Sequence, residues 1–425
     1  MGVIDDLKRH ILVDGFHVVV DTEKSDGSWV VDKETGKKYL DCYSQFASQA
    51  LGWNHPNLNQ HEAFLGKIAL HKIANSDMYS ECYRDFVDSF ANIACPEFDH
   101  FFFISGGALA VENALKAAFD WKMKRNPTIA VGGLDVIHFR QAFHGRTGYT
   151  MSMTNNGGPS HLNVKVMCYP QFAWSRVTNP KIHFPMDIYK VKNLEKIAIQ
   201  EITTALSHRQ VAAVIIEPIQ GEGGDNHFRG EFLKELRDLC DKHEALLIFD
   251  EVQTGFGLTG KWWCHEHFGV TPDILCFGKK TQVCGIAATD RIDDIPNNVF
   301  KVSSRINSTW GGNIVDMARC KIIMEIMKNE GLVQNAAVVG DKFLKAFQEL
   351  HSKYPNKIEN PRGRGLMLAF DCATPQERDE IYSKLMQNML VLKCGEKGIR
   401  FRPHLTFSEQ DVDCAKTFIE DSLKA

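Results

Sequence analysis

Residues 245–280 read ALLIFDEVQTGFGLTGKWWCHEHFGVTPDILCFGKK, and two short apolar runs, 245–252 and 272–278, frame this stretch. Continuous apolar runs of this length are typical of strands that are buried on both faces. Asp250 follows LLIF in the first run, and Lys279 follows CFG in the second. Ligands of open parallel sheets bind beyond the carboxyl ends of the strands, so these two residues are candidates for a functional site.

The central part of the chain continues this alternation of strands and helices. HFFFI (100–104) and VAAVIIEPI (211–219) are further predicted strands, while AVENALKAAFDWKMKR (110–125) and FLKELRDLCDKH (232–243) are predicted helices. Strand–helix alternation with continuous apolar strands predicts an α/β fold with a mostly parallel sheet covered on both faces.

The two ends of the chain predict a second, smaller domain. Residues 13–47 contain the strand-like segments HVVVDTE, WVVDKETG and KKYLDCY, and residues 331–350 show a helical pattern. We expect a large domain over 61–320 and a smaller α+β domain that combines 1–60 with 321–425.

Composition excludes several classes of partner. The net charge of −4 gives no reason to expect nucleic acid or an anionic membrane as a partner. No two of the 12 cysteines stand in a C-x-x-C spacing, so we expect reduced, mostly buried thiols and no metal site. Without a signal-like N-terminus or an apolar run of about 20 residues, the expected location is cytoplasmic.

Polar and glycine residues follow several of the predicted strands. They are Gly106-Gly107-Ala108, Glu217, Glu222, Asp250 and Lys279. A glycine pair between a strand and a helix lets backbone N–H groups approach a phosphate, although a tight turn needed only for packing gives the same pattern. Likewise, Asp250 and Lys279 form either a structural ion pair or part of an active site, and these residues alone leave both open.

Pyridoxal phosphate requires this combination of groups. Its aldehyde needs a lysine amine, its ring nitrogen a carboxylate, and its phosphate a backbone cradle. The carboxylate keeps the ring nitrogen protonated, because an adjacent anion favours the charged form. Once displaced by substrate, the lysine is free to act as general base and acid.

Longer stretches of the sequence carry a family resemblance. They are GGALAVENALKAAFDWK, AFHGRTGY, EPIQGEGGDNHFR, IFDEVQTGFGLTG, DILCFGKKTQVCG, SRINSTWGGN, RGRGLM and IRFRPHL. Across nearly the whole chain the sequence resembles the class III aminotransferases of the fold-type I superfamily, which use pyridoxal phosphate. Within this family, the segments GGALAVENALK and FGKKTQVCG most resemble those of the enzymes that transfer the 6-amino group of L-lysine to 2-oxoglutarate.

The resemblance implies roles around the cofactor ring. Lys279 would carry the cofactor, with adjacent Lys280 structural, and Asp250 would hold the ring nitrogen. Gln253 would lie near the phenolic oxygen and the substrate, and Phe143 would stack on the ring.

For the cofactor phosphate, the resemblance implies a cradle made by the backbone of Gly107 and Ala108. Thr309 would reach the phosphate of a neighbouring subunit, which implies a homodimer with shared active sites. Relatives often carry a hydroxyl or acidic residue where this chain has Gly106–Leu109, a difference that gives the backbone donors and Thr309 more weight.

For the substrates, the resemblance implies that Arg146 binds the distal carboxylate of both L-lysine and 2-oxoglutarate. Arg400 would bind the carboxylate next to the keto group, and Glu222 would neutralise Arg400 during the lysine step. Taken singly, Glu222 and Arg400 look like members of a surface salt bridge. His404 stands where relatives commonly have the second proline of PPL.

Three other functions compete with this one. One is another ω-amino acid aminotransferase, acting on ornithine or 4-aminobutyrate; a difference of one methylene, as between lysine and ornithine, is worth only about 1–3 kcal/mol in discrimination. A non-catalytic phosphate-binding protein has the same scaffold. GFGLTG (255–260) fits the dinucleotide pattern G-x-G-x-x-G, but we expect no helix to open there.

His265-Glu266-His267 lacks the spacing of a zinc helix and is expected at the surface.

Overall fold

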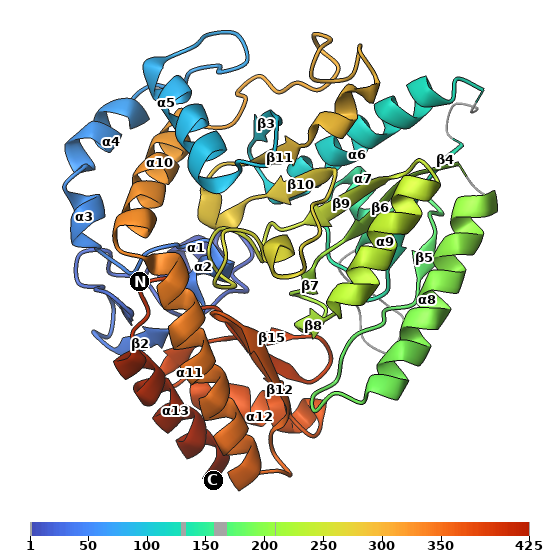
Figure 1. Ribbon diagram of the computed structural model, residues 1–425. Helices are drawn as coiled ribbons and strands as arrows, with labels where there is room; N and C mark the ends of the chain where they lie inside the picture. Colours follow the sequence, from blue (N-terminus) through green and yellow to red (C-terminus); the bar gives the residue numbers. More distant parts are fainter. Residues whose placement is uncertain (1, 129–132, 157–167, 209, 425) are drawn as a thin grey trace.

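The main sheet has the strand order β3-β11-β10-β9-β6-β4-β5 in the computed structural model, which describes residues 2–128, 133–156, 168–208 and 210–424 (Figure 1). Its strands are β3 (His100–Ile104), β4 (Leu134–Phe139), β5 (Arg176–Val177), β6 (Gln210–Ile216), β9 (Leu246–Asp250), β10 (Ile274–Phe277) and β11 (Cys284–Ala288). Neighbouring strands pair in parallel except at β11, which is antiparallel to both β10 and β3. The predicted mostly parallel sheet is confirmed.

Both faces of this sheet are buried, as the unbroken apolar strands predict. In β9, Leu247 and Phe249 pack into one hydrophobic cluster, whereas Leu246 and Ile248 pack into another. Alternate side chains of a strand point to opposite faces. Helix α6 (Gly107–Arg125) contributes to the second cluster, while α8 (Ile188–His208) and α9 (Gly230–Lys242) contribute to the first. The helices therefore cover the two faces separately.

The two ends of the chain meet in smaller sheets. In one, β2 (Lys38–Asp41) pairs with β1 (Trp29–Val31) and, in parallel, with β14 (Met389–Leu390). Another has the order β12-β13-β16-β15, built from β12 (Glu359–Arg364), β13 (Met367–Asp371), β15 (Leu392–Cys394) and β16 (Gly398–Phe401). Figure 1 shows the blue N-terminal strand β2 near the dark red C-terminal helix α13 (Glu409–Lys424). The domain boundaries expected near 60 and 320 stay predictions.

The remaining elements connect these layers. They are α1 (Val3–Lys8), α2 (Ser44–Ala47), α3 (Pro56–Asn59), α4 (Glu62–Ala69), α5 (Glu81–Ser89), η1 (Phe90–Ala94), α7 (Gly148–Met153), β7 (Ile219–Gln220), β8 (Asn226–His227), η2 (Cys264–His267), η3 (Lys279–Thr281), η4 (Asp290–Asp294), α10 (Ile314–Asn329), α11 (Leu332–Lys353), α12 (Pro375–Leu385) and α13 (Glu409–Lys424). Within the described ranges, no helix has the length and apolar character needed to cross a lipid bilayer.

Two local predictions are wrong. HVVVDTE is not a strand, because only Val20 pairs, through an isolated bridge to Asp32. His265 is not at the surface: its side chain is buried, and its Nε2 lies 3.0 Å from Oε1 of Glu97. The GFGLTG segment leads only to the short 3₁₀ turn η2, so no dinucleotide-type helix opens there.

Strand alternation separates the two carboxylates at the end of β9. Asp250 opposes Cys276 of parallel strand β10 and faces the edge where η3 begins with Lys279. Glu251 points away from that edge and accepts hydrogen bonds from the backbone N–H groups of Cys264 (2.6 Å) and His265 (2.8 Å). One carboxylate is therefore structural, and the other is available to a site at the sheet edge.

Replacing Phe249 with alanine tests the core that supports this edge. The side chain of Phe249 is fully buried, so Phe249→Ala should lower the free energy of unfolding by about 3–5 kcal/mol. Val338 on α11 is half exposed, and Val338→Ala should cost less than about 0.5 kcal/mol. Chemical denaturation measures both, and similar losses would contradict a core centred on β9.

Candidate active site

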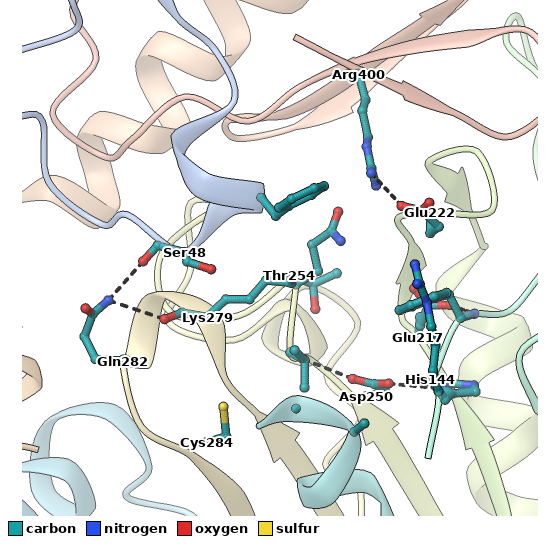
Figure 2. Close-up of a pocket in the computed structure, with 18 residues that line it drawn as sticks. Ser48, His144, Glu217, Glu222, Asp250, Thr254, Lys279, Gln282, Cys284 and Arg400 are labelled. Carbon is teal, nitrogen blue, oxygen red and sulfur yellow. Dashed lines mark hydrogen bonds and ion pairs between the residues drawn. The ribbon is translucent and has the colours of Figure 1, made fainter. Parts of the chain in front are cut away.

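A cavity of about 640 Å³ opens beyond the ends of β9 and β10. Nine of the ten predicted site residues line it: Gly107, Ala108, Phe143, Arg146, Glu222, Asp250, Gln253, Lys279 and Arg400. Figure 2 shows Lys279 extending into the centre, with Asp250 on one side and the facing pair Arg400–Glu222 on another. Thr309 does not line this pocket; it is exposed, and its carbonyl oxygen accepts a hydrogen bond from Oγ of Ser76 at 3.0 Å.

Lys279 is held in an unusual backbone conformation directly after β10. Its φ of 56° is uncommon for a residue with a side chain, and such strain concentrates at functional sites. Burial lowers the pKa of its amine, and the positive charge of Arg400 lowers it further, against the opposing effect of Glu222 and Asp250. A larger neutral fraction makes the amine a better nucleophile toward a carbonyl carbon.

Lys280 has a different environment from its neighbour. It is only 2% exposed, and its Nζ donates hydrogen bonds to the carbonyl oxygens of Ala47 (2.9 Å) and Gln49 (3.4 Å). The amine therefore ties η3 to the N-terminal segment and does not face the pocket.

Asp250 is bonded to a histidine that sequence reasoning missed. Its Oδ2 lies 2.8 Å from Nδ1 of His144, and its Oδ1 accepts the N–H of Val252 at 3.1 Å. Burial disfavours the charged imidazole, but the bond to Asp250 and the charges of Asp250 and Glu217 outweigh it and raise the pKa of His144. A proton on Nδ1 of His144 would be donated to the Asp250 carboxylate and would orient it. The AFHGR motif, in which Phe143 was singled out, is the sequence signal for His144.

Glu217 is a second buried carboxylate at the pocket wall, and its position at a strand end had marked it. It accepts the backbone N–H groups of Phe143 (2.9 Å) and Gly221 (3.0 Å). Burial raises the pKa of Glu217 to about 7, with His144 opposing the shift and Asp250 adding to it. Glu217 thus orients the backbone beside Phe143 and the start of the loop that carries Glu222.

The start of α6 forms the anion-binding end of the pocket. Gly106, with φ of +113°, makes the turn into the helix, and no side chain caps the first N–H groups. A Cβ on Gly107 would lie 2.9 Å from a methyl carbon of Val252, so the close approach requires glycine. Unpaired N–H groups at a helix N-terminus suit a phosphate. The segment Gly106–Leu109 contains no hydroxyl or carboxylate, so these donors are backbone groups.

Two arginines line the remaining part of the pocket. Nη2 of Arg400 lies 2.5 Å from Oε2 of Glu222, while Nε and Nη1 of Arg400 are buried with no hydrogen-bond partner among the described residues. Arg146 is exposed, with its guanidinium 5.9 Å from the ring centroid of Phe143. Unpartnered guanidinium donors in a pocket suit an incoming carboxylate.

His404 does not displace Arg400 from the pocket. Its Nδ1 lies 2.7 Å from Oγ1 of Thr406, and burial lowers its pKa to about 3, so it is a neutral packing residue. A Cβ on Gly52 would approach its ring to 3.0 Å, which shows how tightly it packs against the N-terminal segment.

Phe46 and Ser48 are pocket residues that no sequence signal indicated. They come from the N-terminal segment, and Ser48 accepts a hydrogen bond from Nε2 of Gln282 at 2.9 Å through its carbonyl oxygen. Thr254 and Cys284 also line the pocket (Figure 2). Phe46 and Ser48 reach the site only because the N-terminal segment packs against η3.

The residues present fit pyridoxal phosphate. Lys279 offers an amine of lowered pKa, Asp250 a carboxylate held by His144, and the start of α6 a set of backbone donors, all facing one cavity. Over the described residues, no group of three or more histidine, cysteine or acidic side chains is arranged to hold a metal ion.

The chain is similar to known proteins over nearly its whole length. Residues 13–423 match the family Aminotransferase class-III. The L-lysine-epsilon aminotransferase of Mycobacterium tuberculosis is 46% identical over 428 residues, which cover 98% of this chain and 94% of that protein. The 4-aminobutyrate aminotransferase of Kluyveromyces lactis is 34% identical and covers 96% of this chain and 90% of its own. The solved structure of a lysine aminotransferase from M. tuberculosis in the internal aldimine form has a TM-score of 0.95 at 45% identity, covering 99% of this chain and 98% of that chain.

Reductive labelling distinguishes the two adjacent lysines. Incubation with pyridoxal phosphate followed by borohydride should attach a pyridoxyl group to Lys279, because its amine faces the pocket. Peptide mass mapping should find the label in wild type and in Lys280→Arg, which keeps hydrogen-bond donors toward Ala47, but not in Lys279→Ala. A label on Lys280 would contradict the site.

Proposed function

The chain belongs to the class-III aminotransferases, and from this premise we propose that it transfers the ε-amino group of L-lysine to 2-oxoglutarate. The products would be L-glutamate and the 6-semialdehyde of lysine, which cyclises on its own α-amine. The observation that carries the proposal is a pocket lined by two arginines, one of which is paired with a glutamate that lines the same pocket. The 46% identity to a lysine-epsilon aminotransferase supports lysine as the donor.

Bound pyridoxal phosphate supplies an electrophilic carbon and a ring that takes up the electrons released when the substrate carbon loses its proton. Lys279 would hold this group through Nζ, and its free amine would move a proton to and from the reacting carbon. Asp250 would present its carboxylate to the ring nitrogen, and the contact with His144 would hold that carboxylate in place. Phe143 and Gln253 line the same pocket and would orient the ring and the substrate.

The two substrates differ in what lies next to the reacting carbon. Lysine has only methylenes there, while 2-oxoglutarate has a carboxylate. Arg146 would bind the distal carboxylate of either substrate, and Glu222 would neutralise Arg400 while lysine is bound. A unit ion pair at about 4 Å is worth roughly 4 kcal/mol at an effective dielectric of about 20, before desolvation is subtracted. An interaction of that size would keep Arg400 paired with Glu222 while lysine is bound. It is also small enough for an incoming carboxylate to displace Glu222.

We propose a homodimer with shared active sites. Thr309 and Trp310 are exposed on the chain, outside its own pocket, where Thr309 is available to a neighbouring subunit. In that arrangement its hydroxyl would add a donor to the phosphate-binding backbone of Gly107 and Ala108. The cytoplasmic location expected from the sequence stays a prediction.

A panel of ω-amino donors tests the proposed substrate. With 2-oxoglutarate as acceptor, L-lysine should give glutamate and a cyclic imine about 10-fold faster than ornithine reacts, since the one methylene between them is worth about 1–3 kcal/mol. It should also react faster than 4-aminobutyrate, which is shorter still and lacks the α-amine. Mass spectrometry of each carbonyl product identifies the amine that reacted, and Lys279→Ala serves as the inactive control. A preference for ornithine or 4-aminobutyrate would reject lysine as the main donor.

Removing the Glu222 carboxylate tests the proposed switch. Glu222→Ala leaves Arg400 positively charged against the lysine methylenes, so the single-turnover rate with lysine should fall about 10-fold or more, a loss of about 1.4 kcal/mol. The rate with glutamate, whose carboxylate pairs with Arg400, should change by less than about 3-fold. Stopped-flow absorbance of the holoenzyme measures both rates, and equal losses would eliminate the switch.

A further inference from the structure

The loop of residues 221–225, GEGGD, is joined to the C-terminal sheet by two adjacent ion pairs. Arg400 lies in β16 and Arg402 comes directly after the strand, and both side chains reach this loop. Arg400 pairs with Glu222, and Nη2 of Arg402 pairs with Oδ1 of Asp225. Phe401, between the two arginines, packs into the hydrophobic core on the other side.

The two pairs differ in their access to the pocket. The side chain of Glu222 is 24% exposed and lines the cavity, whereas those of Arg402 and Asp225 are 1% and 0% exposed. A buried pair is hard to break, because removing one partner leaves an uncompensated charge away from water. We therefore expect the Arg402–Asp225 pair to stay closed, whereas a ligand in the pocket can reach the Arg400–Glu222 pair.

Further contacts fix the backbone of the loop. Arg362 of β12 donates to the carbonyl oxygens of Gly224 (2.6 Å from Nη2) and Asp225 (3.0 Å from Nε). The N–H of Gly395 donates to the carbonyl oxygen of Glu222 at 3.0 Å. A Cβ on Gly223 would lie only 1.9 Å from the carbonyl oxygen of Gln141, so the loop lies directly against its neighbour. These contacts act together with the Arg402–Asp225 pair to hold the main chain that carries Glu222.

Arg402 also orients a pocket side chain. Its Nε lies 3.1 Å from Oε1 of Gln253, and its Nη1 donates to the carbonyl oxygens of Leu368 (3.3 Å) and Phe401 (2.9 Å). A guanidinium carries only donors, so the atom of Gln253 that it contacts must be the amide oxygen. The N–H₂ group of Gln253 is then left for an acceptor in the pocket.

We propose that Arg402 and Asp225 are a positioning pair that confines the switch between the two half-reactions to the side chain of Glu222. The pair anchors the loop next to Glu222 and sets the amide orientation of Gln253, without touching substrate itself. This inference rests on the proposed lysine transamination. With the anchor loosened, Glu222 would leave Arg400 more readily, and the lysine step, which needs that pair closed, would suffer selectively.

The test uses the holoenzyme and the isosteric variant Asp225→Asn. Single-turnover absorbance changes are followed with L-lysine and, separately, with L-glutamate, both starting from the same resting form. The lysine rate should fall about 10-fold while the glutamate rate changes by less than about 3-fold. Equal falls in both rates would overturn the inference, because a merely structural pair affects the two substrates alike.

A double-mutant cycle sharpens the test. In a Glu222→Gln background the switch is already absent, so adding Asp225→Asn should leave the ratio of lysine to glutamate rates unchanged. A further drop in that ratio would show that Asp225 acts by another route and would overturn the inference. A wild-type holoenzyme that fails to react with lysine while reacting with another donor would instead overturn the proposed function.

Glu195→Gln is the matched control. Glu195 accepts from Nε of Arg229 at 3.1 Å in a mostly buried pair outside the pocket, so this variant also neutralises an ion-paired carboxylate. It should leave the ratio of lysine to glutamate rates as in wild type. If Asp225→Asn does not fold, Arg402→Lys replaces it, since it keeps the charge opposite Asp225 but loses the planar fork that also reaches Gln253. The same selective fall with lysine is expected, and an unchanged ratio would overturn the inference.

Discussion

The parallel pairing of β9 with β10 is the constraint on which the candidate site depends. Parallel strands end at the same edge of a sheet, and the register that sets Cys276 opposite Asp250 brings Lys279 to that edge one turn later. Both strands are buried on both faces, so this edge is a rigid support and not a mobile loop. A carboxylate and an amine can then face one cavity with little freedom to move apart.

The charges around this cavity are compensated unequally, and the inequality marks where ligands belong. Glu217 and Glu251 each accept backbone N–H groups, and Asp250 is bonded to His144. Arg400, by contrast, keeps two buried nitrogen atoms without a partner among the described residues. Buried donors are costly to leave unsatisfied, so a substrate carboxylate that reaches Arg400 gains more than the same group would gain in water.

The site is completed by parts of the chain outside the main sheet. The C-terminal sheet supplies Arg400, and through Arg402 and Arg362 it holds the loop that carries Glu222. The N-terminal segment supplies Ser48, whose carbonyl oxygen accepts a hydrogen bond from Gln282, three residues after Lys279. Several pocket residues therefore come from segments that pack on the edge of the main sheet, and the pocket forms only where these segments meet.

The local sequence pattern was sufficient to predict much of the fold and of the candidate site. Apolar runs predicted β3, β6, β9 and β10, because the periodicity of a strand is set by residues that are neighbours in the sequence. The positions directly after these strands then identified Asp250, Lys279 and Glu217 as candidate site residues. The positions after the strands also included Glu222, and the family resemblance added Arg146 and Arg400; all three residues line the pocket. Three features were decided only by the tertiary structure. His265 is buried against Glu97, and HVVVDTE does not form a strand. Arg402 pairs with Asp225, which lies 177 residues away in the sequence. A polar side chain's partner depends on which distant segments pack beside it, and no local pattern of residues contains that information.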